Sequence, residues 1–341
     1  MRRFLIRCIL FILVPVILLA VLYFVSDPYK TLKPFSLQYF DITNRDYLST
    51  ELFLMNDGKY DYDSFIFSSS RGSGFNTYHW KEYLGEDARP FLFQAWGETV
   101  TGIEQKVSFL DARGNKLKNA IVLLDMPGSF IDNQHPTKAL LIKDPTTSRQ
   151  PRWIHQLILL YDFLQKPSQW IKAIKGITSP QKVNVSFDPV TNDWDKNDLY
   201  QDFDNPPPKD SLKNCSLQLR NEFIRDCASK TDDDLSTSNS VITEKQAGQL
   251  MHIKHIFDKH NTDYRVVISP GYCYTYPAVS PDDLETLYDI FGREKVFDYS
   301  GKNELTSDCY NFSDPNHFGK YIGWMIIENI YNGRTIEGKL K

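Results

Sequence analysis

The sequence predicts an α/β protein, a three-layer α/β/α sandwich with a mainly parallel sheet, preceded by one N-terminal transmembrane helix. Continuous apolar runs of strand length alternate with helix-like stretches, which is typical of a parallel sheet covered by helices on both faces. An uncharged stretch long enough to cross a bilayer lies near the start of the chain. The 341 residues suffice for one large domain with insertions or for two small ones, and we expect one domain.

The membrane prediction rests on residues 1–25. The stretch from Cys8 to Val25 carries no charge, and as a helix it is about 27 Å long, close to the thickness of a bilayer core. The basic residues of this region all precede it: Arg2, Arg3 and Arg7. We therefore expect a single-pass protein with a cytoplasmic N-terminus and an extracytoplasmic domain, periplasmic or on the outer face. A cleaved signal peptide is the alternative, but no Ala-x-Ala follows the apolar run, which favours an uncleaved signal anchor.

A juxtamembrane lead-in, rich in aromatic residues and aspartate, is expected over residues 26–58, and the folded domain over 59–335. The first half of this domain predicts strands and helices in alternation. In chain order they are a strand at Ser64–Phe67, a helix near Trp80–Leu84, a strand at Pro90–Gln94, a helix at Glu104–Leu110 and a strand at Ala120–Leu124.

The middle of the chain predicts one helix and then an insertion. Apolar residues recur on one helical face from Trp153 to Ile174. This helix either packs on the domain, which is the simpler placement, or lies on the membrane surface, given Lys172 and Lys175. Residues 178–240 then break the alternation with a triple proline, an acidic run and many Asn and Ser residues, which indicates an insertion.

Regular structure is expected to resume at Thr243, where Thr-Glu-Lys-Gln has the spacing of a capping box and predicts the start of a helix. The remaining expected elements are a strand at Tyr264–Ile268, a helix at Pro281–Phe291, a strand at Val296–Phe297 and a final helix from about Gly319 to Tyr331.

Charge and cysteine content limit the partners and the compartment. The formal charge of −4, without a basic stripe, gives no reason to expect nucleic acid. Four cysteines follow the apolar stretch and would face an oxidising compartment after export: Cys215, Cys227, Cys273 and Cys309. They allow three pairings, and free buried thiols remain open as well. Cys215 and Cys227 would lie about 18 Å apart on an unbroken helix, too far to bond, whereas a bridge between Cys273 and Cys309 would brace the loop before Asp314.

Ser70, Asp314 and His317 have the order and surroundings of a catalytic set. Ser70 stands where the first expected strand gives way to a helix, so its hydroxyl is expected at the carboxyl edge of the sheet beside N–H groups that can hold an oxyanion. A serine hydroxyl needs a base, and His317 can serve. Asp314 can accept a hydrogen bond from the imidazole and fix its tautomer. A serine at a strand end is also a common polar turn or helix cap, which is the simpler alternative.

Two other arrangements compete with this set. Asp132-Asn133-Gln134-His135 has the same Asp-x-x-His spacing, but it directly follows a strand and lacks a strand-plus-helix frame. The segment Ser68–Gly72 approximates the Gly-x-Ser-x-Gly nucleophile elbow of α/β-hydrolases. That fold normally places its serine after several strands and its acid well before the histidine, which differs from the order found here.

These motifs together resemble the SGNH (GDSL-type) hydrolase superfamily, and most closely its membrane-anchored, exported branch, similar to the DltD and alginate O-acetylation accessory proteins. The first block of the family falls on Ser68–Arg71 and the last on Asp314–His317, while Gly97 in Gln-Ala-Trp-Gly matches the glycine of the second block. The resemblance implies that Ser70, Asp314 and His317 are catalytic and that the N–H groups of Ser70 and Gly97 form the oxyanion hole.

The chain departs from the family pattern at two positions. Ser68 replaces the glycine of the first block. The Gly-x-Asn-Asp of the third block is missing, and Asp125 stands in Leu-Leu-Asp-Met-Pro after the third strand. An ionised Asp125 cannot donate a hydrogen bond to an oxyanion, so one usual donor lacks a counterpart.

The resemblance implies an exported, membrane-anchored serine esterase or O-acyltransferase that uses an acyl-serine intermediate. Its substrate would be an acylated carbohydrate or cell-envelope polymer, with acetyl as the expected acyl group, and a membrane-bound O-acyltransferase would be a partner. No metal or other cofactor is implied. A catalytically inert SGNH-like module that binds polysaccharide or such an acyltransferase is the alternative. The missing asparagine favours this module, and the intact Ser–Asp–His set opposes it.

Weaker candidates lie beside these motifs. Arg71, Trp96 and Asp125 are candidate substrate contacts. A structural salt bridge is an equal alternative for Arg71, and core packing is the simpler role for Trp96. His252 and His255 are three residues apart on a predicted helix and could share a metal, but no third ligand accompanies them, and a solvated helix face is the simpler reading.

Overall fold

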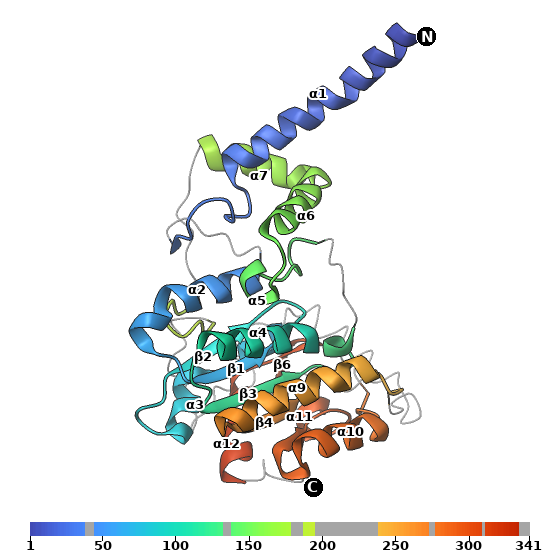
Figure 1. Cartoon of the computed structure of the whole chain (residues 1–341). Coiled ribbons are helices and arrows are strands. Elements are labelled where there is room, and N and C mark those ends of the chain that lie inside the picture. The colour runs from blue at the N-terminus through green and yellow to red at the C-terminus, as the bar shows by residue number, and fades with distance from the viewer. Residues whose placement is uncertain are drawn as a thin grey trace. The chain divides into compact units, whose positions relative to one another are not determined.

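The computed structural model describes residues 1–37, 44–131, 138–178, 187–194, 238–272, 277–308 and 311–333. The chain forms two compact units (Figure 1). The helical unit comprises residues 1–51 and 133–185, and the sheet unit comprises 52–132 and 186–341. Several expectations lie outside the described residues, namely the four cysteines, the Asp132–His135 motif and most of the insertion at 178–240.

The sheet unit contains five parallel strands: β1 (Ser64–Ser68), β2 (Pro90–Gln94), β3 (Asn119–Leu124), β4 (Asp263–Ile268) and β5 (Val296–Asp298). Their order across the sheet is β2-β1-β3-β4-β5, and all four pairings are parallel. The predicted α/β class with a parallel sheet is therefore confirmed. Every expected strand is present with bounds that differ by at most one residue, because buried parallel strands are continuous apolar runs.

Alternate strand residues enter different packing clusters, as the two-residue period of a strand requires. Ile66, Leu92 and Ile121 belong to a buried cluster that also contains Trp80 and the apolar residues of the final helix. Phe65 and its neighbours point the other way. The ring of Phe53 lies 6.1 Å from that of Phe65 and 5.7 Å from that of Phe93. Both faces of the central strands are thus fully buried.

The longer helices of the sheet unit are α3 (Thr77–Leu84), α4 (Val100–Arg113), α9 (Glu244–His260), α10 (Pro281–Phe291) and α12 (Lys320–Asn332). Figure 1 shows α4 and α9 side by side along the sheet, where they pack on each other. The capping box of α9 is confirmed, since the Thr243 hydroxyl accepts from Gln246 N and the Gln246 side chain accepts from Thr243 N.

Short elements that the sequence did not predict complete this unit. They are the 3₁₀ helices η2 (Ser70–Gly74), η3 (Gly128–Phe130) and η6 (Arg293–Lys295), the short helix α11 (Glu304–Ser307), and an antiparallel hairpin of β6 (Phe312–Asp314) and β7 (His317–Phe318). Two of them, η2 and the hairpin, carry the residues of the predicted catalytic set.

The helical unit contains α1 (Arg2–Ser26), the start of α2 (Arg45–Tyr60), α5 (Pro145–Ser148), α6 (Arg152–Leu164) and α7 (Pro167–Thr178). The expectation of a single helix over Trp153–Ile174 is wrong, because the structure has two helices there, α6 and α7. Pro167 begins α7, where its missing N–H costs no hydrogen bond, and a proline in a helix interior would break it. Helix α2 falls in the stretch that was expected to be a lead-in.

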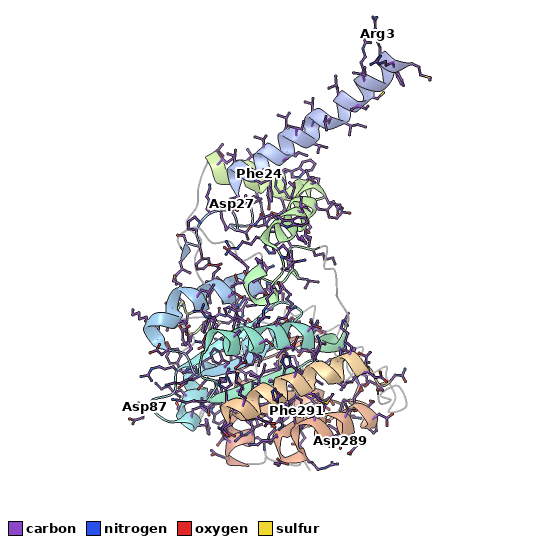
Figure 2. The ribbon with its side chains drawn as sticks, in the orientation of Figure 1. Arg3, Phe24, Asp27, Asp87, Asp289 and Phe291 are labelled. Atoms are coloured by element: carbon purple, nitrogen blue, oxygen red, sulfur yellow. The ribbon has the colours of Figure 1, made fainter. Side chains whose placement is uncertain are left out.

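Helix α1 is long and apolar enough to cross a membrane. Its C-terminus is fixed by Asp27, which adopts a left-handed conformation and donates its N–H to the Tyr23 carbonyl at 2.9 Å. The Asp27 carboxylate then accepts three backbone N–H groups, from Thr31, Leu32 and Lys33. Figure 2 labels Phe24 and Asp27 at this end of the helix. The chain therefore turns sharply where the apolar stretch ends.

Candidate active site

The candidate site lies where the strand order reverses. From β1 the chain goes to β2 on one side, and from β2 it returns past β1 to β3 on the other side. In open α/β sheets ligands bind at the carboxyl ends of the strands at such a switch point. Ser69 and Ser70 follow β1, Gln94 ends β2, and Asp125 follows β3. Ser70, the expected nucleophile, thus lies at the position where this sheet topology favours ligand binding.

Ser70, His317 and Asp314 form a continuous hydrogen-bonded chain. The Ser70 Oγ lies 2.8 Å from His317 Nε2, and His317 Nδ1 lies 2.7 Å from Asp314 Oδ2. The other carboxylate oxygen, Asp314 Oδ1, accepts the backbone N–H groups of Asn316 and His317 at 2.8 and 3.2 Å. The tight turn between β6 and β7 therefore holds the carboxylate beneath the imidazole. The imidazole side chain is 28% exposed, so the site is open to a ligand.

The charge of Asp314 decides how the imidazole is used. Burial alone raises the pKa of the carboxyl group, but the hydrogen bonds from the His317 ring and from the N–H groups of Asn316 and His317 outweigh it and hold the pKa below its ordinary value. An ionised Asp314 can only accept, so it selects the tautomer with the proton on Nδ1. Nε2 is then free of a proton and can take the one on Ser70.

Ser70 is held in place by the residue before it, Ser69, and by Gln94 at the end of β2. The Ser69 Oγ accepts the Arg71 N–H at 3.1 Å and caps the 3₁₀ helix η2. The Gln94 side-chain amide donates to the carbonyls of Ser69 and Ser70 at 2.9 and 3.3 Å. Trp194 Nε1 in turn donates to Gln94 Oε1 at 2.7 Å. Sequence reasoning missed the positioning roles of Ser69, Gln94 and Trp194; a buried polar residue ending an apolar strand was the available signal for Gln94.

Asp125 and Arg71 lie together in the interior behind Ser70. They are 7% and 6% exposed, and Arg71 Nε is 3.8 Å from Asp125 Oδ1. The Ser69 hydroxyl donates to the other oxygen, Asp125 Oδ2. Burial raises the pKa of Asp125 although the Arg71 guanidinium opposes this shift. The pair therefore fits the structural salt bridge better than a pair of substrate contacts.

Trp96 and Gly97 form the turn that follows β2. Gly97 is exposed and has a φ of +51°, a left-handed conformation that favours glycine. The half-buried Trp96 ring lies 5.7 Å from the ring of Trp194. Trp80, the other tryptophan near the motifs, is fully buried and donates its Nε1–H to the Tyr331 hydroxyl at 2.9 Å, so it belongs to the core.

Glycines allow the nucleophile segment to approach the histidine segment closely. A Cβ added at Gly323 in α12 would lie 2.0 Å from the Gly74 carbonyl oxygen, and one added at Gly74 would lie 2.3 Å from the Phe318 ring. A Cβ at Gly72 would lie 1.9 Å from the Ser68 Oγ. Such distances are far below van der Waals contact. Helix η2 can therefore rest against β7 and α12 only because Gly74 and Gly323 lack side chains.

His252, one of the two candidate metal ligands on α9, contacts a carboxylate at the protein surface. Its Nδ1 lies 2.7 Å from Glu104 Oε1 on α4. Within the described ranges, no group of three or more His, Cys, Asp or Glu residues is placed to hold a metal ion.

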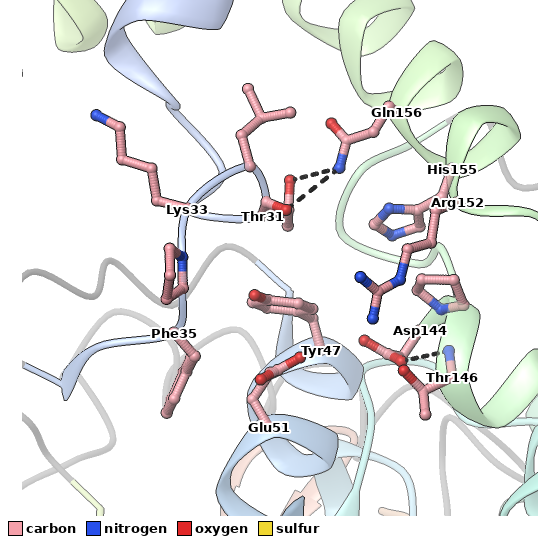
Figure 3. A pocket seen from close by; sticks show the side chains of 13 residues that line it. Thr31, Lys33, Phe35, Tyr47, Glu51, Asp144, Thr146, Arg152, His155 and Gln156 are labelled. Carbon is pink, nitrogen blue, oxygen red and sulfur yellow. Dashed lines mark hydrogen bonds between the residues drawn. The ribbon is translucent and has the colours of Figure 1, made fainter. Parts of the chain in front are cut away.

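A cavity of about 390 Å³ lies within the helical unit (Figure 3). Its polar lining includes Arg152, Glu51, Asp144 and His155. Burial, with Asp46 nearby, raises the pKa of Asp144 to about 7, and burial lowers that of His155 to about 4. The lining contains both cationic and acidic groups, so it selects no single class of ligand.

No protein-family model matches the sequence, and no curated protein matches it.

Proposed function

We propose that this protein is a membrane-anchored, exported serine esterase or O-acyltransferase of SGNH type, in which Ser70 is the nucleophile, His317 the general base and Asp314 the residue that orients it. The single observation that carries the proposal is the aligned Ser70–His317–Asp314 chain at the switch point of the sheet. The sheet order β2-β1-β3-β4-β5, with both faces buried, also supports the three-layer α/β/α arrangement of that family.

The reaction follows from the geometry. As Ser70 Oγ attacks the ester carbonyl carbon, its proton passes to His317 Nε2, 2.8 Å away. The N–H groups of Ser70 and Gly97 stabilise the tetrahedral oxyanion. When the ester C–O bond breaks, the leaving oxygen takes the proton from Nε2 and an acyl-serine remains. A second hydroxyl then gives its proton to Nε2 and attacks the acyl carbon. The acyl–Oγ bond breaks, Ser70 Oγ takes the proton back from Nε2, and the free serine is restored. Water as this second hydroxyl completes hydrolysis, and a sugar hydroxyl completes transfer.

The substrate and location are proposed from the anchor and the family resemblance. Helix α1 would cross the membrane with Arg2, Arg3 and Arg7 on the cytoplasmic side, and the sheet unit would then be extracytoplasmic. An extracytoplasmic acyl-transfer site at a membrane suits acyl groups, acetyl above all, on cell-envelope or exported polysaccharide. A membrane-bound O-acyltransferase would supply or receive the acyl group.

The second candidate function is a catalytically inert module that binds polysaccharide or such an acyltransferase. Asp125 favours the inert module, because this buried acid stands where SGNH hydrolases have an asparagine donor. Its carboxylate accepts a hydrogen bond from Ser69 and forms an ion pair with Arg71.

Covalent labelling separates the two candidates. The full chain, purified in detergent, is incubated with a fluorophosphonate probe that reacts with activated serines. The proposal predicts labelling that disappears in Ser70→Ala and persists in Ser73→Ala, a matched control in the same 3₁₀ helix. A folded wild-type protein that stays unlabelled would favour the inert module.

A further inference from the structure

Helices α6 and α7 expose apolar side chains that a soluble surface would not normally display. On α6 they recur every fourth residue and on α7 every third, so each set occupies one side of its helix. The six residues are 49–65% exposed: Trp153, Leu157 and Tyr161 on α6, and Ile171, Ile174 and Ile177 on α7. We call them the α6–α7 apolar face.

The opposite sides of the same helices are buried. Leu159 and Phe163 of α6 and Ala173 of α7 pack in one cluster with Tyr23 and Tyr29. Helix α6 is therefore apolar on a side that is already covered and on a second side that is not. A contiguous exposed apolar surface marks a site of contact with a protein or a membrane. We therefore expect that another molecule covers the α6–α7 apolar face.

Lipid is the partner that the neighbouring structure indicates. Helices α6 and α7 both pack on α1, and Figure 1 shows α7 crossing its C-terminal end. The contact is specific, because the Tyr23 hydroxyl donates to Gln156 Oε1 at 2.7 Å and its ring lies 5.5 Å from that of Phe163. Phe24 and Val25 in the same turn of α1 are 56% and 58% exposed. The two helices therefore sit where a membrane-spanning α1 would leave the hydrocarbon layer.

The charge of this region points to an anionic surface. Residues 149–178 contain five cations and one acid, a balance of 5 − 1 = +4, whereas the whole chain has a charge of −4. The cations are Arg149, Arg152, Lys166, Lys172 and Lys175. The acid, Asp162, is buried and bonded to the Tyr29 hydroxyl and to Lys166. Basic residues beside an apolar helix face attract anionic lipid headgroups.

We propose that α6 and α7 lie in the plane of an anionic bilayer surface, with the α6–α7 apolar face inserted below the headgroups and the basic residues among them. This second membrane contact would restrict rotation of the helical unit about α1 and hold the unit at the bilayer surface. The inference rests on the part of the proposed function in which α1 spans the membrane, and it is independent of the catalytic chemistry.

The test measures the depth of Trp153. The full chain is reconstituted into vesicles of phosphatidylcholine and phosphatidylglycerol whose acyl chains carry bromine near the headgroup, and tryptophan fluorescence is compared between wild type and Trp153→Phe. The difference isolates the Trp153 signal, which should fall by roughly half or more, as expected for a ring buried about 5–10 Å into the interface. Trp324 in α12 is the control. Its signal, obtained as the difference between wild type and Trp324→Phe, should not be quenched by the bromine. Quenching should weaken in phosphatidylcholine alone.

Three results would overturn the proposal. Carbonate extraction of the protein would show that α1 does not span the membrane. Retention in the membrane with an unquenched Trp153 would show that α1 spans while the α6–α7 apolar face stays off the lipid. Unquenched Trp153 together with cross-linking between chains through this face would assign it to a second copy. Serine labelling of the same samples reports on the proposed chemistry separately, so the two failures are distinguishable.

Discussion

The Oγ atom of Ser70 lies 2.8 Å from Nε2 of His317, although 247 positions separate the two residues in the chain. This meeting depends on two pieces of local structure. Helix η2 turns Ser70 outward at the end of β1, and the β6–β7 hairpin returns His317 to the same edge. Close packing of η2 on β7 and α12 joins the two.

Loss of the Asp314 carboxylate should leave the fold intact and disable the base. In Asp314→Asn the amide no longer selects the tautomer with the proton on Nδ1, so Nε2 cannot take the Ser70 proton. We expect kcat for hydrolysis of a simple acetyl ester to fall on the order of 10,000-fold. Asp282→Asn, an exposed change in the first turn of α10, is the control and should keep wild-type turnover. Equal turnover of Asp314→Asn and Asp282→Asn would show that Asp314 has no role in the mechanism.

The contact between Gly323 and Gly74 should be intolerant of a single methyl group. Because the group that a Cβ at Gly323 would meet is a backbone carbonyl, it cannot rotate away. Gly323→Ala should therefore lower the free energy of unfolding by about 1–3 kcal/mol and displace η2 from β7, with loss of serine labelling.

Gly248→Ala provides the matched control for that substitution. Gly248 is also a helical glycine, in α9, and nothing lies within 4 Å of its Cβ position. Alanine there should stabilise the protein by up to about 1 kcal/mol, since it is the better helix former. Chemical denaturation of the two variants tests the pair, and similar midpoints would contradict the close packing.

Ser68 and Gly72 should be coupled. Gly72→Ala places a methyl group against the Ser68 hydroxyl, so we expect destabilisation of about 1–3 kcal/mol. Ser68→Gly removes that obstacle, and the next atom, Gln94 Nε2, is at an ordinary 3.7 Å. The double variant should therefore recover most of the stability lost in Gly72→Ala. Additive effects in a double-mutant cycle would show that the two positions do not constrain each other.

Asp125→Asn tests whether the site lacks an oxyanion donor. The amide would supply a hydrogen-bond donor of the kind that SGNH hydrolases use, and a single donor is typically worth about 100- to 1000-fold in rate. We expect kcat/KM to rise by roughly tenfold or more, less than the full value because the side chain is held by Ser69 and Arg71. Asp125→Ala supplies no donor and should not gain. A similar loss in both variants would mean that Asp125 acts through Ser69 and Arg71 instead.

Asp193 should make stability depend on pH. Its carboxyl group is buried and accepts from Thr77 N, Thr77 Oγ1 and Thr191 Oγ1, and burial raises its pKa from 3.8 to about 6. The folded protein thus binds the proton more tightly than the unfolded chain, so stability falls as pH rises from about 4 to about 6, by at most about 3 kcal/mol. Asp193→Asn should flatten this part of the pH profile of denaturation. An unchanged slope would assign it to other groups.

Strand positions were predictable from sequence and several site residues were not. The runs Phe65–Phe67 and Ala120–Leu124 are apolar throughout and are bounded by polar or turn residues, so the length and type of these two strands follow from composition. The role of Gln94 depends on strand register, which pairs it with Ser68 and so brings its amide to the Ser69 and Ser70 carbonyls. No single-sequence pattern reports that register.

Other features were too short or too mixed to predict. The strands of the β6–β7 hairpin have three and two residues, so no periodicity can develop. Helix α2 mixes polar and aromatic residues without a clean apolar stripe, and it was expected to be a lead-in. Proline at 167 split an apolar pattern that otherwise continues through both α6 and α7.

The most direct measurement is mass spectrometry of the intact chain, acid-quenched during turnover of an acetyl ester and then digested to locate any adduct. We expect a mass increase of one acetyl group on the peptide that contains Ser70, present in wild type and Ser73→Ala and absent in Ser70→Ala. An ester turned over equally well by Ser70→Ala, with no acetylated serine in the wild type, would contradict it.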